Sequence, residues 1–178
     1  MKKTMMIAAI FCLVCAATVI GGGKEEYSKY VNEELGLSFE YPADFIETAP
    51  LYPGEITRFT KPNEYGVPVI TASVRDRSED VLLIDLPDRV IKFMEVSIPG
   101  SSGFEILEEK SVELPDGADA VIVQFSWVSP DGSTVMETVS VFAFSGDRQF
   151  TVTANTIQGL GFSLDDLADS CLTLRVSL

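Results

Sequence analysis

Hydrophobic and polar positions alternate most regularly between residues 118 and 156. Phe150, Val152 and Ala154 alternate with polar residues at 149, 151, 153 and 155, and a two-residue period predicts a strand that buries one face. The runs 120–128 and 134–144 are rich in β-branched and aromatic residues, which predicts two further strands. Turn-forming residues at 129–133 and 145–148 separate the three runs. We therefore expect an antiparallel meander as the centre of the fold.

Two segments show the period of an amphipathic helix. In residues 85–97, one apolar face is predicted to hold Leu86, Val90, Phe93, Met94 and Ser97, and Asp85, Pro87 and Asp88 suit a helix start. In the second segment, Leu164, Leu167, Ala168 and Cys171 share a face behind a Ser163-Leu164-Asp165-Asp166 start that is similar to a capping box. A sheet of this size needs a covering layer. We expect the two helices to pack on the meander.

The remaining strand signals complete an α+β fold. Segments 27–32 and 37–41 predict a hairpin, and the runs 56–60, 67–74, 104–114 and 172–176 predict further strands. Residues 46–54 are expected to be irregular because Pro50 and Pro53 interrupt them, and 75–80 to form a charged loop. The prediction is an antiparallel sheet of about six or more strands with helices packed on it, in a single domain at 24–178.

The first 23 residues have the pattern of a secretory signal. Lys2 and Lys3 precede an apolar run at 5–20, and Gly21 and Gly23 are small enough for cleavage after residue 23. An uncleaved anchor is the second interpretation, although sixteen helical residues span only about 24 Å. Lipidation at Cys12 or Cys15 is the third, but their flanking residues depart from a lipobox. All three predict a secreted, periplasmic or otherwise extracytoplasmic protein, held at a membrane in the last two.

Composition narrows the classes of partner. Without Lys2 and Lys3, 11 of the 13 basic residues remain against 27 acidic ones, a formal charge of −16. Such a surface repels nucleic acid and anionic lipid headgroups, so neither is expected as a partner. The charge favours either a cationic partner or simple solubility. Cleavage would leave Cys171 as the single cysteine, which excludes an internal disulfide.

Candidate catalytic residues find no support in the sequence. The chain has no histidine, so imidazole-based triads and imidazole metal sites are excluded. Cys171 lies at an apolar helix position and is interpreted as a buried thiol, and Trp127 shares strand parity with core positions. Acidic pairs or Asp-Gly steps at 108–109, 116–117, 131–132 and 165–166 fit strand edges, turns and a helix start. We predict no catalytic, metal or cofactor residues.

A resemblance to a known family adds to this interpretation. Residues 36–45, Gly-Leu-Ser-Phe-Glu-Tyr-Pro-Ala-Asp-Phe, resemble the opening motif of PsbP-like proteins. The helix at 85–97, the meander ending at 150–154 and the helix before 172–176 follow in the order of the PsbP and Mog superfamily. The resemblance implies an α/β/α sandwich around an antiparallel sheet and a typically non-catalytic protein. The histidines associated with metal binding in PsbP have no counterpart here.

The sequence therefore predicts a non-catalytic extracytoplasmic accessory or binding module that contacts an unidentified protein partner, at a membrane or free of one. Two other hypotheses stay open. One is a carboxylate-dependent hydrolase or a calcium-binding secreted protein, because carboxylates are abundant. The other is a purely structural envelope protein. No cofactor is expected in any of them.

Overall fold

The computed structural model describes residues 26–78 and 81–177. A seven-stranded sheet has the order β3-β4-β5-β9-β8-β7-β6, and a three-stranded sheet has the order β1-β2-β10. The paired strands run antiparallel throughout. Strand bounds are β1 Tyr27–Asn32, β2 Leu37–Pro42, β3 Ile46–Thr48, β4 Glu55–Thr60, β5 Val69–Asp76, β6 Ser102–Glu113, β7 Asp119–Val128, β8 Val135–Ser145, β9 Arg148–Ile157 and β10 Arg175–Val176. The helical elements are η1 Leu83–Asp85, α1 Leu86–Ser97 and α2 Leu164–Leu172.

The predicted meander is present as β7, β8 and β9, which lie side by side in the large sheet. Phe150, Val152 and Ala154 are buried, while the residues between them are half-buried. The expectation of one buried face is confirmed. Strand β5 pairs with the free side of β9 across the whole of β5, from Val69 opposite Asn155 to Asp76 opposite Arg148.

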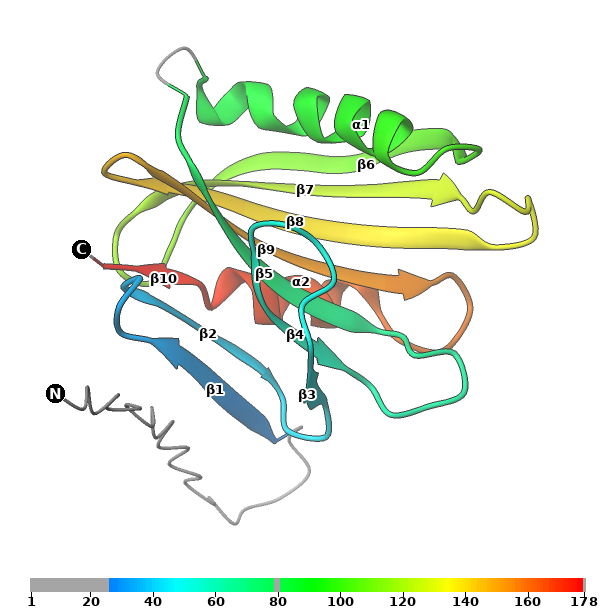
Figure 1. The fold of residues 1–178 in the computed structure, drawn as a ribbon, viewed down its shortest axis with the longest axis horizontal. Helices are drawn as coiled ribbons and strands as arrows, with labels where there is room; N and C mark the ends of the chain where they lie inside the picture. Colours follow the sequence, from blue (N-terminus) through cyan, green and yellow to red (C-terminus); the bar gives the residue numbers. More distant parts are fainter. Residues whose placement is uncertain (1–25, 79–80, 178) are drawn as a thin grey trace, which may run out of the picture.

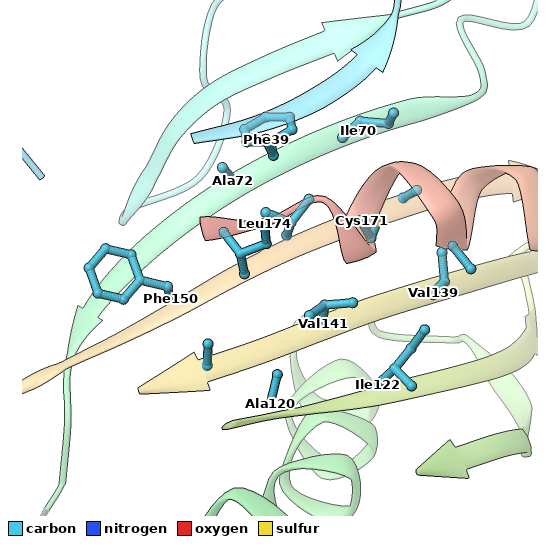
Figure 2. Packing of buried hydrophobic residues seen from close by; sticks show 14 of the residues in the cluster. Phe39, Ile70, Ala72, Ala120, Ile122, Val139, Val141, Phe150, Cys171 and Leu174 are labelled. Carbon is cyan, nitrogen blue, oxygen red and sulfur yellow. The ribbon is translucent and has the colours of Figure 1, made fainter. Parts of the chain in front are cut away.

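The larger core lies on one face of the seven-stranded sheet. Val139, Val141 and Ile122 lie on the side of the sheet next to α2 and Cys171 (Figure 2), and Phe39 of β2 belongs to the same cluster. The three-stranded sheet is part of this core, because an aromatic group of Tyr30, Phe39, Tyr41 and Phe59 joins it to β4 with ring centroids 3.8 to 6.4 Å apart. Burial of this apolar surface is the main stabilising contribution.

A smaller core lies on the opposite face, beneath α1. Val123, Phe125 and Trp127 of β7 and Phe142 of β8 pack with Leu86 at the start of α1. Figure 1 shows α1 running along β6 and β7, away from β1 and β2. The expected packing of helices on the sheet is present, one helix for each face. The α/β/α sandwich is not confirmed, because the layer that contains α2 is shared with the three-stranded sheet.

Several local predictions were wrong or imprecise. Residues 46–54 contain β3, which pairs with β4 over only three residues and is too short to produce a pattern. The segment predicted as a loop from residue 75 begins two residues later, because β5 extends to Asp76. The predicted final strand is reduced to β10 and pairs with β2.

The start of α1 also differs from the prediction. Asp85 occupies the N-cap position, but its carboxylate accepts the Leu82 N–H of the preceding turn at 3.3 Å and makes no cap bond to the helix. Phe93, assigned to the apolar face, is 52% exposed. At α2, Ser163 does cap the helix, since its Oγ accepts the Asp165 N–H at 3.1 Å.

Candidate binding surface

The single tryptophan is a core residue, as the strand parity predicted. The ring of Trp127 stacks on Phe104 of β6 with centroids 6.2 Å apart and an interplanar angle of 11°. Its Nε1 donates a hydrogen bond of 3.2 Å to Thr138 Oγ1. The stacking surface and the N–H group of Trp127 are therefore both engaged by residues of the protein itself, so the ring does not serve as a platform for a ligand.

Cys171 is buried in the larger core with no exposed surface. Burial raises the pKa of its thiol to about 12, because the thiolate would lose its hydration there. A thiol that stays protonated at neutral pH is a poor nucleophile. The structure confirms the interpretation of Cys171 as a packing residue.

The acidic pairs considered in the sequence lie apart from one another. Asp131 has the most perturbed carboxylate: hydrogen bonds from Ser129 and Ser133 hold its pKa at about 2, and these bonds close the β7–β8 turn. Asp116 accepts the N–H groups of Ala118 and Val176. Residues 165–166 occupy the first turn of α2, and 108–109 lie on β6. Within residues 26–78 and 81–177, no three metal-ligating side chains form a group that could hold an ion.

A cavity of about 410 Å³ lies between the end of β2 and the start of α2. Asp44, Lys61, Phe162 and Asp166 are among its lining residues. The Lys61 ammonium is ion-paired with Asp44 and lies 5.8 Å from the centre of the Phe162 ring. Its cation therefore already has partners from the cavity wall. No geometry here points to a particular ligand.

The more informative feature is an uncovered part of the large sheet. On the face that carries α1, the apolar cluster draws on β6, β7 and β8, and on no residue of β4, β5 or β9. The register places polar side chains of these three strands on that same face. We call this surface the open face. Its members are Arg58, Thr60, Thr71, Ser73, Arg75, Gln149, Thr151, Thr153 and Asn155, together with the buried Val69 and with Glu55, which lie opposite Asn155 and Ser73 respectively.

Rows of facing residues cross the open face. Arg58 lies opposite Thr71, which lies opposite Thr153, and Thr153 lies opposite Ser140 of β8. The Thr153 and Ser140 hydroxyls are hydrogen-bonded at 2.9 Å, and Thr138 donates to Asn155 Oδ1 at 2.8 Å. These bonds fix the side chains of the inner rows. The open face is thus an ordered array in which hydroxyl and amide groups predominate.

Arginines border this array, each beside an aromatic ring. The guanidinium carbon of Arg75 lies 5.2 Å from the centre of the Phe93 ring, and that of Arg77 lies 4.2 Å from the Phe144 ring. Phe93, misassigned to the helix core, therefore extends from α1 toward the open face. Neither Arg75 nor Arg77 takes part in an ion pair among the described residues. Their charges remain available to an anionic partner.

The third arginine is held more firmly. Arg58 Nη2 lies 3.0 Å from Glu55 Oε1, with 14% and 4% of the two side chains exposed. Glu55 also accepts the N–H of Tyr52 at 3.1 Å, and the Arg58 guanidinium lies 5.8 Å from the Tyr52 ring. Arg58 Nε is buried and has no hydrogen-bond partner in the described segments 26–78 and 81–177. The loop before β4 is therefore held to the edge of the open face by the Tyr52 N–H, which donates to Glu55, and the Arg58 ion pair fixes the Glu55 carboxylate within β4.

Gly54 allows this loop to approach β5. Its φ is +84°, and its carbonyl accepts the Val74 N–H at 3.0 Å. A Cβ atom at this position would lie 3.3 Å from the Val74 carbonyl oxygen. Glycine meets both the conformational and the steric requirement.

Sequence reasoning did not find the open face. The alternation of Thr71 and Ser73 with Ile70 and Ala72 is that of any strand with one solvent face. The available signal was that arginines occur close to threonines and serines in the sequence, in 57–60 and in 71–77, although the chain is strongly acidic. It became informative only once β5 was seen to pair with β9.

The N-terminal leader predicted for residues 1–23, with its cleavage point after residue 23, lies outside the described residues. Among residues 26–78 and 81–177, no helix is long and apolar enough to cross a membrane.

Antiparallel strands with one helix on each face define the structural class of the chain, and comparison with solved structures specifies it further. The solution structure of cyanobacterial PsbP from Synechocystis sp. superposes with a TM-score of 0.66 at 17% identity, covering 90% of this chain and 98% of that one. The protein therefore has a PsbP-like fold. The resemblance inferred from residues 36–45 is confirmed at the level of the fold.

A second structure, from Bacteroides thetaiotaomicron, has a TM-score of 0.57 at 14% identity. It covers 87% of this chain, which spans 50% of that one. No protein-family model and no curated protein matches the sequence. Identities this low establish the fold and leave the function to be argued from the surface.

Proposed function

We propose that the protein is a non-catalytic extracytoplasmic accessory or binding module of PsbP-like type, which contacts a protein partner through the open face. The single observation that carries the proposal is that this face is polar, ordered and free of a covering element within the described residues. Its arginines stand out in a chain of strongly negative charge. The partner is expected to present carboxylate side chains to them.

Charge and geometry support this choice of partner. Arg75 and Arg77 border one end of the array and form no ion pair among the described residues, whereas Arg58 in the outer row is already paired with Glu55. Guanidinium groups bind carboxylates through paired hydrogen bonds, and neighbouring hydroxyl and amide groups supply further donors. The rings of Phe93 and Phe144 limit the conformations of two guanidinium groups before binding. This lowers the entropy lost on association.

The predicted leader fits the same function. A cleaved signal would release the module outside the cytoplasm, and an uncleaved segment would hold it beside a membrane. The acidic remainder of the surface would keep it away from anionic lipid headgroups. The proposed contact is therefore with a protein of the envelope rather than with the bilayer. A hydrolase or a calcium-dependent protein has no specific observation in its favour.

Binding of a fluorescent oligoglutamate peptide tests the charge preference. The double variant Arg75→Glu/Arg77→Glu should lose the peptide, whereas Arg175→Glu, an exposed charge reversal on β10, should bind as the wild type does. Circular dichroism and thermal unfolding would establish that each variant is folded. Equal binding by all three proteins, or none by the wild type at low salt, would contradict the proposed partner chemistry.

A further inference from the structure

Strand β6 forms one end of the seven-stranded sheet and, among the described residues, pairs only with β7. It runs for twelve residues, whereas β3 at the opposite end runs for three. Within the part of the chain that the structure describes, the backbone hydrogen bonds outside the regular elements include none to residues 102–113. Every second N–H and C=O of β6 therefore points away from the sheet. A row of this kind is a template for another strand.

The regular part of this edge extends from Glu108 to Glu113. Its register with β7 is continuous, from Glu108 opposite Gln124 to Glu113 opposite Asp119. Irregularities occur only before it, between Ser102 and Glu105 and between Ile106 and Glu108. They leave Ile106 and Leu107 about half exposed next to the regular part. Six regular residues are about 20 Å long, which suffices for a short added strand.

Charge distinguishes among possible occupants. Lys110 is ion-paired with Glu108 at 3.0 Å. Glu109 and Glu113 lie on the other face of β6, opposite Val123 and Asp119, and form no ion pair among the described residues. They are four residues apart, so their carboxylates are separated by about 13 Å along the strand.

We propose that the β6 edge binds an extended basic segment of a partner protein, which adds an eighth strand to the sheet. Two cationic side chains four residues apart on that segment would lie opposite Glu109 and Glu113. Opposite charges facing each other across paired strands are stabilising, and like charges are destabilising. In the antiparallel register centred on Ser111, a second copy of this chain would place Glu109 opposite Glu113, so these residues disfavour pairing of β6 with itself in that register.

This proposal goes beyond the open face and does not depend on it. The two surfaces differ in location and in sign: the open face offers arginines on β4 and β5, and the β6 edge offers glutamates at the other end of the sheet. Main-chain hydrogen bonds would supply the affinity and the two carboxylates the selectivity. Variants that abolish binding at the open face should therefore leave binding at the β6 edge unchanged, and the reverse.

A pair of synthetic peptides tests the proposal on the folded protein. One alternates threonine and valine and carries two lysines four residues apart. The control has the same composition with the lysines three apart, on opposite faces of a strand. The first peptide should bind about fivefold more tightly, and it should slow amide hydrogen exchange within residues 108–113. Equal binding of both peptides, or unchanged exchange in β6, would overturn the proposal.

Charge exchange provides the matched control. The variant Glu109→Lys/Glu113→Lys should lose the preference for the lysine peptide and instead prefer a peptide with glutamates at the same two positions. If this variant is unstable, Glu109→Gln/Glu113→Gln should still abolish the fivefold preference. An unchanged preference in the glutamine variant would contradict the role of these carboxylates. Dimers of the wild type that protect β6 without peptide would show a second copy as the occupant and overturn the proposal.

Discussion

Replacing Phe39 by alanine should destabilise the protein more than any surface change, because this side chain joins the small sheet to the large one. Phe39 is fully buried, and its ring lies 5.4 Å from Tyr30, 6.4 Å from Tyr41 and 6.0 Å from Phe59. Removing a buried phenylalanine costs about 3–5 kcal/mol of unfolding free energy. Each lost contact between two aromatic rings contributes roughly 0.5–1.5 kcal/mol to that total.

The loss is large relative to a total stability of about 5–15 kcal/mol. For a chain of this length, about 1 kcal/mol lowers Tm by roughly 2–4 °C, so Phe39→Ala should lower Tm by about 10 °C. Urea unfolding followed by circular dichroism would measure the change in free energy. The control is Tyr52→Ala, at a side chain that is 68% exposed. Equal stability of the Phe39 variant and the wild type would refute the view that the two sheets share one core.

Three further outcomes are expected. The pKa of the Cys171 thiol is raised from an ordinary 9.0 to about 12 in the folded protein. The free energy of unfolding is therefore unaffected by this group below pH 9 and falls as the pH rises from about 9 to 12. Urea titrations at several pH values should show that Cys171→Ala flattens this fall. The pKa of Asp131 is lowered from 3.8 to about 2, so its stabilising effect is present above pH 4 and is lost between about pH 4 and 2; Asp131→Asn should remove this acid dependence. Gly54→Ala should cost about 1–2 kcal/mol in thermal unfolding, whereas alanine at Gly117, which has a positive φ but no atom near its Cβ, should cost less.

The sequence predicted those elements whose side chains repeat with a clear period. Phe150, Val152 and Ala154 identified β9, and the spacing of Leu167, Ala168 and Cys171 identified the buried side of α2. In both cases the local pattern and the tertiary packing require the same faces to be apolar. Such agreement makes an element predictable before its neighbours are known.

Other features depend on contacts between distant segments. Strand β3 forms because Ile46, Glu47 and Thr48 pair with β4. Three residues are too few to show a hydrophobic period in the sequence. The spacing of Phe93 along the sequence fits the apolar face of α1, yet its ring lies next to the guanidinium group of Arg75 from β5. The strand order that creates this neighbour is not encoded in either segment alone.

The candidate surface shows the same limit. Thr71 and Thr153 are unremarkable as solvent-facing strand residues, and they form one row only because β5 pairs with β9. The uncovered area arises because the apolar cluster beneath α1 draws on β6, β7 and β8 and includes no residue of β4, β5 or β9. A sequence pattern predicts that a strand face is polar, but not whether another element covers it.

Photo-crosslinking in living cells tests the central claim most directly, since it requires no knowledge of the partner. A photoreactive amino acid would replace Thr153 at the centre of the open face or, as the control, the exposed Val31 of β1. The account predicts one crosslinked species of defined mass from position 153 and none from position 31, with the product lost in the Arg75→Glu/Arg77→Glu background. The same species from both positions, or none from position 153, would contradict docking through this face.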